Sequence, residues 1–143
     1  MINRILVPLD GSERAELVLP FSIMEAKHHQ STLVLLRVVP HLKDTIVVVP
    51  AIIDDIYDQA KIRAEEYLQK LAAQLQAEGY QVETHVLVGS PGQQILDFAE
   101  NTKCDLIVIG SHGTTGAVQW RFGSIAGKVV RSETSMPVVV IST

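Results

Sequence analysis

The sequence predicts an α/β protein in which helices cover both faces of a five-stranded parallel sheet. Apolar strand-like segments alternate four times with segments of helical periodicity, and one further strand follows near the C-terminus. Several strands are apolar at consecutive positions, which is typical of parallel strands buried on both faces. Right-handed crossovers should connect these strands. Residues 1–143 are expected to form one domain, because a chain of this length fits one compact core.

The first strand is predicted over residues 3–9, and a turn over residues 10–12 follows it. The next apolar residues have helical spacing. Either Asp10 or Ser12 could cap this helix, and Pro20 is expected to bend it. Asp10 also stands at the carboxyl end of a central parallel strand, where such sheets bind ligands. A capping role and a ligand role are therefore both open for Asp10.

The second strand is predicted over residues 32–39, an apolar run that Arg37 interrupts. Arg37 is expected near the exposed end of this strand. The third strand, residues 80–88, alternates more regularly and contains Glu83 and His85. This alternation favours an edge position with one face reaching water, and His85 is interpreted as structural.

The segment between the second and third strands has two parts. Residues 41–55 are irregular, and Pro50 is expected to prevent one continuous helix. Its apolar part, residues 45–53, is interpreted as an extended loop packed on its own domain. A flap over a cleft and a surface covered by another subunit are the alternatives. A long helix is predicted from Ile56, with Gly79 as its end.

The last third of the chain contains a helix and two strands. Ser90 and Pro91 are typical of an N-cap and a first helical turn. Cys104 precedes the fourth strand and is interpreted as a packing residue. The fourth strand is predicted over residues 106–109, and the fifth over residues 137–141.

The most informative stretch is the loop that follows the fourth strand. The apolar strand stops at Gly110, a loop rich in Gly and Thr follows, and helical spacing restarts after Gly123 and Ser124. Ser124 is predicted to be the N-cap of the last helix. Glycines let backbone N–H groups approach an anion, and a helix N-terminus favours negative charge. The stretch therefore predicts a phosphate-binding loop.

Two commoner phosphate loops do not fit. A Walker-type loop has four residues between its first glycine and Gly-Lys, whereas three separate Gly123 from Gly127-Lys128. A dinucleotide-binding fingerprint should follow the first strand, where the turn has only Gly11. Both readings are excluded.

Composition excludes several further classes. A net charge of −4 without a Lys/Arg cluster argues against a nucleic-acid partner. The single cysteine excludes an internal disulfide and a cysteine metal cluster. Neither a signal pattern nor an apolar run of about 18 residues occurs. The protein is expected to be soluble and cytoplasmic, with no membrane partner.

The spacing Gly110-x2-Gly113-x9-Gly123-Ser124 after a buried strand resembles the nucleotide-binding signature of the universal stress protein family. The likeness extends along nearly the whole chain. It implies an adenine nucleotide alpha hydrolase-like sheet with strand order 3-2-1-4-5. The carboxyl ends of strands one and four then form a crevice. The resemblance also implies that ATP, or AMP or ADP, lies there, and that the protein acts in stress resistance.

The resemblance identifies an acidic position at Asp10, an apolar base contact at Val38, and a phosphate-facing amide at Ile125. Arg121 is the preferred cationic phosphate contact, ahead of His112 and Lys128. A magnesium ion would accompany ATP, and Asp10 is the candidate ligand. The candidate nucleotide-binding residues are Pro8, Leu9, Asp10, Val38, Ile109, Gly110, His112, Gly113, Arg121, Gly123, Ser124 and Ile125.

The sequence favours a regulatory module over a fast enzyme. It shows no second acidic motif to position a water molecule for phosphoryl transfer. A receiver domain would need Asp where Gly89 stands, and Ser111-His112 lacks a nucleophile-elbow sequence. We therefore expect ATP binding with at most slow hydrolysis. A slow ATPase or nucleotidyl-transfer enzyme, and an interaction protein that binds no nucleotide, are the alternatives.

The fifth strand predicts a homodimer. In the implied order it is an edge, and residues 137–141 carry no charge to discourage pairing. Pairing with the same strand of a second copy would satisfy both rows of backbone groups. A monomer whose edge is covered by residues 45–53 is the alternative.

Overall fold

The computed structural model describes residues 1–41, 50–112 and 124–143. Five parallel strands form one sheet in the order β3-β2-β1-β4-β5, which confirms the predicted fold class and strand order. The strands are β1 (Arg4–Pro8), β2 (Thr32–Val39), β3 (Gln81–Val88), β4 (Leu106–Gly110) and β5 (Val138–Ile141). The predicted edge position of the third strand is also confirmed.

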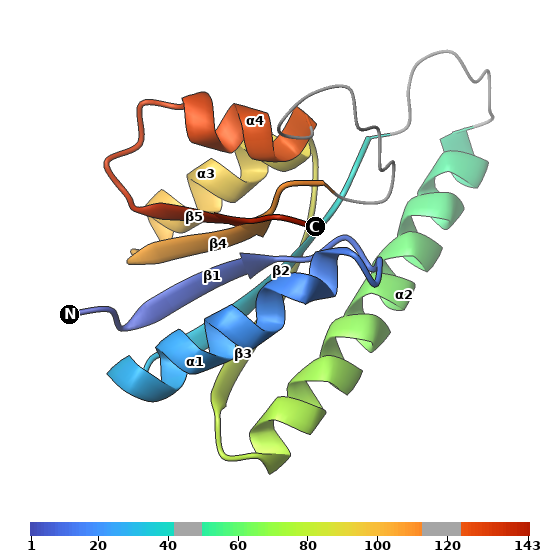
Figure 1. Cartoon of the computed structure of the whole chain (residues 1–143). Coiled ribbons are helices and arrows are strands. Elements are labelled where there is room, and N and C mark those ends of the chain that lie inside the picture. Colours follow the sequence, from blue (N-terminus) through green and yellow to red (C-terminus); the bar gives the residue numbers. More distant parts are fainter. Residues whose placement is uncertain (42–49, 113–123) are drawn as a thin grey trace.

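Helices cover both faces of this sheet. Helices α1 and α2 lie on one face, and α3 and α4 lie on the other (Figure 1). Their bounds are α1 (Leu19–His29), preceded by the 3-10 turn η1 (Ala15–Val18), α2 (Pro50–Ala77), α3 (Pro91–Asn101) and α4 (Ser124–Arg131). No helix in the described ranges is long and apolar enough to span a bilayer.

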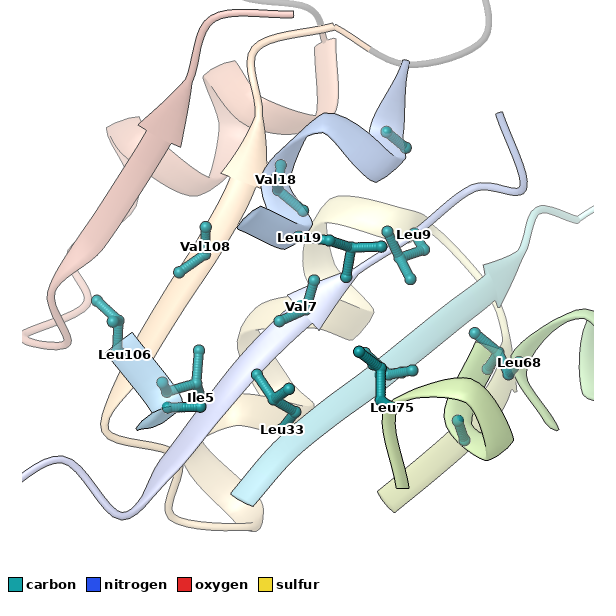
Figure 2. Packing of buried hydrophobic residues seen from close by; sticks show 14 residues of the cluster. Ile5, Val7, Leu9, Val18, Leu19, Leu33, Leu68, Leu75, Leu106 and Val108 are labelled. Carbon is teal, nitrogen blue, oxygen red and sulfur yellow. The ribbon is translucent and has the colours of Figure 1, made fainter. Parts of the chain in front are cut away.

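The core consists of two apolar layers, because successive strand side chains point to opposite faces of the sheet. On the α1/α2 face, Val7 and Leu33 pack with Leu68 of α2 (Figure 2). On the other face, Leu6 packs with Val129 of α4. All five side chains are fully buried. The strands are therefore held from both sides, and their carboxyl ends are fixed in position.

The long helix begins earlier than predicted. Helix α2 starts at Pro50, so the predicted start at Ile56 is wrong. Proline is compatible with a first helical turn, because the N–H that it lacks would have no partner in the helix. Gly79 follows the end of α2 with a φ of +97°, a conformation that favours glycine. Residues 42–49, most of the predicted irregular segment, lie outside the described residues.

Two local predictions also change. Ser124 is the first residue of α4, so the prediction that it is the N-cap is wrong. Pro20 lies in the first turn of α1, where the 3-10 turn becomes an α-helix. A proline in a first turn interrupts no helical hydrogen bond, so it marks this junction and does not bend an uninterrupted helix.

Candidate functional site

A pocket of about 210 Å³ lies at the carboxyl ends of the strands. Nine predicted site residues line it: Pro8, Leu9, Asp10, Val38, Ile109, Gly110, His112, Ser124 and Ile125. The other three, Gly113, Arg121 and Gly123, lie outside the described residues. Eight further residues that were not predicted also line the pocket: Ala15, Leu36, Arg37, Pro40, Pro91, Ile95, Ser111 and Ala126.

Asp10 forms part of the turn after β1. Its Oδ1 accepts hydrogen bonds from the Ser12 N–H at 2.9 Å and from the Ser12 Oγ at 2.5 Å. The Ser12 Oγ in turn accepts from the Ala15 N–H at 3.1 Å, at the start of η1. Ser12 therefore accepts a hydrogen bond from the first residue of this helical segment, and Asp10 holds Ser12 in place. Asp10 combines this structural role with a place in the pocket wall.

Strand β2 extends beyond the end of its pairing with β1. The last bond between them joins the Leu9 N–H to the Leu36 carbonyl at 2.8 Å, whereas the Val39 carbonyl accepts from Gly89 on the β3 side at 3.0 Å. Backbone groups of a parallel strand alternate between its two neighbours. The N–H and carbonyl of Val38 therefore point to the β1 side, into the crevice that begins where β1 ends.

Arg37 contributes a cationic wall to this end of the pocket. Its Nη1 donates to the Val38 carbonyl at 2.7 Å. Burial lowers the pKa of Arg37, while the charges of Asp10 and Tyr67 act in the opposite direction. A guanidinium stays protonated in proteins despite such a shift. Arg37 lies near the carboxyl end of β2, as predicted, and it is half-buried in the pocket wall.

The segment after β4 is fastened to the end of the β5 strand. The Ser111 N–H donates to the Ile141 carbonyl at 2.8 Å. The Thr143 Oγ1 accepts from the His112 N–H at 3.0 Å and donates to the His112 carbonyl at 2.9 Å. A Cβ on Gly110 would lie 3.0 Å from the Thr143 Cγ2. Glycine at position 110 is therefore explained by the close approach of Thr143.

Helix α4 directs its N-terminus at the pocket. Its first three residues, Ser124, Ile125 and Ala126, all line it, and Ser124 is exposed. The first amides of a helix have no partner within the helix, so they favour an anion at this end. Lys128 is exposed and packs over Gly92 of α3, where a Cβ would lie 2.8 Å from the Lys128 Cδ. Lys128 does not line the pocket.

The pocket thus joins an apolar chamber to a few polar groups. Among the described lining residues, Asp10 is the only carboxylate and Arg37 the only arginine or lysine. The described residues include no group of three or more side chains suited to hold a metal ion. Such a pocket is suited to a ligand with a flat apolar part and an anionic part.

The sequence matches the model of the universal stress protein family over residues 1–142. The chain belongs to this family. Its sequence is 32% identical to universal stress protein YxiE of Bacillus subtilis, over 99% of each chain. This agreement confirms the family that the resemblance predicted.

Solved structures of universal stress proteins extend the comparison. The hypothetical protein MJ0577 of Methanocaldococcus jannaschii superposes with a TM-score of 0.88 at 26% identity, covering 100% of this chain and 97% of that one. The universal stress protein of Archaeoglobus fulgidus in complex with dAMP has a TM-score of 0.70 at 28% identity, with coverages of 99% and 98%. That relative therefore binds an adenine nucleotide.

Proposed function

We propose that this universal stress protein binds an adenine nucleotide, ATP or its products ADP and AMP, in the pocket at the carboxyl ends of β1, β2 and β4. It would act as a regulatory module of the stress response in the cytoplasm. One observation carries the proposal: Val38, whose backbone groups face the crevice, and the N-terminus of α4 line the same pocket. The dAMP complex of the Archaeoglobus fulgidus relative supports this choice of ligand.

The β2 side of the pocket suits the base. The N–H of Val38 can donate to a ring nitrogen, and its carbonyl can accept from an exocyclic amino group. Adenine presents an acceptor beside such an amino group. Apolar side chains of Leu36, Val38 and Ile95 line the chamber in which the ring would lie. The base would therefore be held by two backbone groups and by burial of its apolar surface.

The α4 side of the pocket suits the phosphates. The amides of Ser124 and Ile125 would donate to phosphate oxygens, and the helix dipole favours the negative charge. Gly113, Gly123 and Arg121 are proposed to complete this end. Magnesium would join through Asp10 and the phosphates, because Mg²⁺ commonly uses one carboxylate, phosphate oxygens and water. One carboxylate that already holds Ser12 fits such a site only with the phosphates present.

The same arrangement favours binding over rapid hydrolysis. Fast phosphoryl transfer needs a group that positions the attacking water and cations that stabilise the transferred phosphoryl group. Among the described lining residues, the single carboxylate is occupied by Ser12, and Arg37 lies at the base end. We therefore expect turnover far below the roughly 10 s⁻¹ of a typical enzyme.

We also propose a homodimer through β5. This strand is at the edge of the sheet, and its four residues are all aliphatic. An uncharged edge of this kind readily pairs with another strand. A two-fold pairing of β5 with β5 would cover the open backbone groups of both copies.

The site is tested by titrating the protein with Mg-ATP in a calorimeter, with Ser124→Asp as the central variant. Aspartate is favoured in the first turn of a helix, so the fold should tolerate it. A carboxylate there would repel phosphate, so we expect the dissociation constant of Mg-ATP to increase at least tenfold. The uncharged, similar-sized Ser124→Asn should lose much less affinity. Equal affinities of the parent and Ser124→Asp would contradict the proposed phosphate site.

The bound ligand itself can be identified in a second experiment. Protein purified without added nucleotide is extracted and the extract is separated by chromatography. Recovery of ATP, ADP or AMP in a fixed ratio to protein supports the proposal. Absence of nucleotide, together with no binding in the calorimeter, would favour the alternative of an interaction protein.

A further inference from the structure

Arg37 is placed where it meets the part of a ligand that lies against β2. It lies on the α1/α2 face of the sheet, because Leu35 packs in that layer and Leu36 in the opposite one. From there its guanidinium reaches the crevice and donates to the Val38 carbonyl at 2.7 Å. The negative charge of Asp10, which follows β1, favours the protonated guanidinium. The hydrogen bond to Val38 thus places the group at the base end of the pocket.

This position changes what the end of β2 offers to a ligand. With Arg37 on the Val38 carbonyl, the carbonyl already has a donor. An exocyclic amino group on a purine must then displace Arg37 or share the same oxygen. A guanidinium has five N–H donors and no acceptor, so four remain for other partners. A ligand atom that approaches the guanidinium should therefore be an acceptor.

Purines differ in this respect. Adenine presents the N7 acceptor beside its N6 amino donor, whereas guanine presents two acceptors, N7 and O6, to which arginine binds in a bidentate fashion. Hypoxanthine carries the same O6 and N7 pair. We infer that Arg37 is a specificity-determining residue that weakens the preference for adenine and admits 6-oxopurine nucleotides to this pocket. This inference rests on the proposed nucleotide-binding function.

The affinity ratio of nucleotides tests this role. Dissociation constants of Mg-ATP, Mg-GTP and Mg-ITP are measured by calorimetry for the parent chain and for Arg37→Leu. In the parent, we expect GTP and ITP to bind within about tenfold of ATP. In Arg37→Leu, the freed Val38 carbonyl should strengthen ATP binding, and loss of the donors should weaken GTP and ITP together. The ratio of the GTP dissociation constant to the ATP dissociation constant should therefore rise by about tenfold.

Two further variants distinguish the specificity role of Arg37 from an effect of its positive charge alone and from a loss of fold. Arg37→Lys keeps the positive charge but lacks the planar fork, so its ratio should also move toward ATP. Arg63→Leu removes an exposed arginine of α2 that does not line the pocket, and its ratio of GTP to ATP dissociation constants should match the parent. Circular dichroism and thermal unfolding of each variant identify any loss of fold.

The outcomes distinguish this inference from the function on which it rests. The inference alone is overturned if both the parent and Arg37→Leu bind ATP and the ratio of their GTP and ATP dissociation constants is the same. A parent that binds ATP but neither GTP nor ITP overturns it as well. A parent that binds none of the three nucleotides overturns the proposed function and the inference with it. A shift of GTP and ITP together, absent in Arg63→Leu, supports both.

Discussion

The two edges of the sheet are built differently. At the β3 edge, the carboxylate of Glu83 accepts two hydrogen bonds from the guanidinium of Arg4 of β1, at 3.0 and 2.9 Å. His85 of the same strand lies 3.5 Å from the Glu83 carboxylate. The β5 edge has only Val and Ile. Charges at an edge discourage strand addition, so β3 is protected by its own side chains, whereas β5 carries no charge that would discourage pairing.

The backbone of β5 shows which amides are available to such a partner. The Ile107 N–H donates to the Pro137 carbonyl at 3.0 Å, and the Ser111 N–H donates to the Ile141 carbonyl at 2.8 Å. Carbonyls at odd positions of β5 therefore point toward β4. By alternation, the N–H of Val139 points inward and the N–H of Val140 points outward.

Proline substitution at Val140 should have the largest effect, because it should abolish the proposed dimer at the β5 edge. Val140→Pro removes an outward donor and leaves the ladder with β4 intact. Sedimentation equilibrium at micromolar concentration should give about twice 15.7 kDa for the parent and the single mass for the variant. Val139→Pro is the matched control, because it removes an inward donor and should lower the free energy of unfolding by about 1–3 kcal/mol. A parent that is monomeric at all concentrations would exclude the β5 dimer.

A dimer through β5 should also make the stability of the parent depend on protein concentration. Each tenfold rise in protein concentration should raise the free energy of unfolding of the parent by about 1.4 kcal per mole of dimer. The reason is that association removes folded monomer from the unfolding equilibrium. The transition of Val140→Pro should not depend on concentration. Thermal unfolding at several concentrations measures both. Parallel behaviour of the two proteins would indicate that β5 is not the dimer interface.

The smallest effect is expected at the β3 edge. The hydrogen bond from Arg4 lowers the pKa of Glu83, so the ion pair stabilises the fold above the ordinary glutamate pKa and is lost as the pH falls below it. Because the side chain of Glu83 is 42% exposed, Glu83→Gln should cost less than about 1 kcal/mol at pH 7. Urea denaturation at pH 7 and in acid tests the sign. A cost that grows in acid would contradict this assignment.

Sequence reasoning located the crevice because topology constrains it. The carboxyl ends of β1 and β4 meet whenever these strands are central neighbours, so Asp10 and Gly110 line one pocket. The strand order itself came from the family resemblance, since periodicity does not specify which strands pair. Local patterns succeeded where one interaction dominates, as with Ser12, whose hydroxyl accepts a hydrogen bond at the helix start.

The misses have physical causes. Arg37 was expected near the exposed end of its strand but was not predicted to line the pocket, where Asp10 and the Val38 carbonyl compensate for its desolvation. Its position beside a predicted base contact was the available signal. The role of Gly110 depends on Thr143, 33 residues later, and a local pattern contains no information about such a contact. A proline was interpreted as a helix breaker at Pro50, where it begins α2.

The bonds between His112 and Thr143 connect the proposed ligand pocket to the proposed dimer edge. His112 lines the pocket, and Thr143 follows β5 by two residues. If occupancy of the pocket alters these bonds, it alters the end of the strand that pairs with the second copy. Thermodynamic reciprocity then applies: any factor by which nucleotide changes dimer affinity equals the factor by which dimerisation changes nucleotide affinity. The concentration of free nucleotide would then help to set the ratio of monomers to dimers.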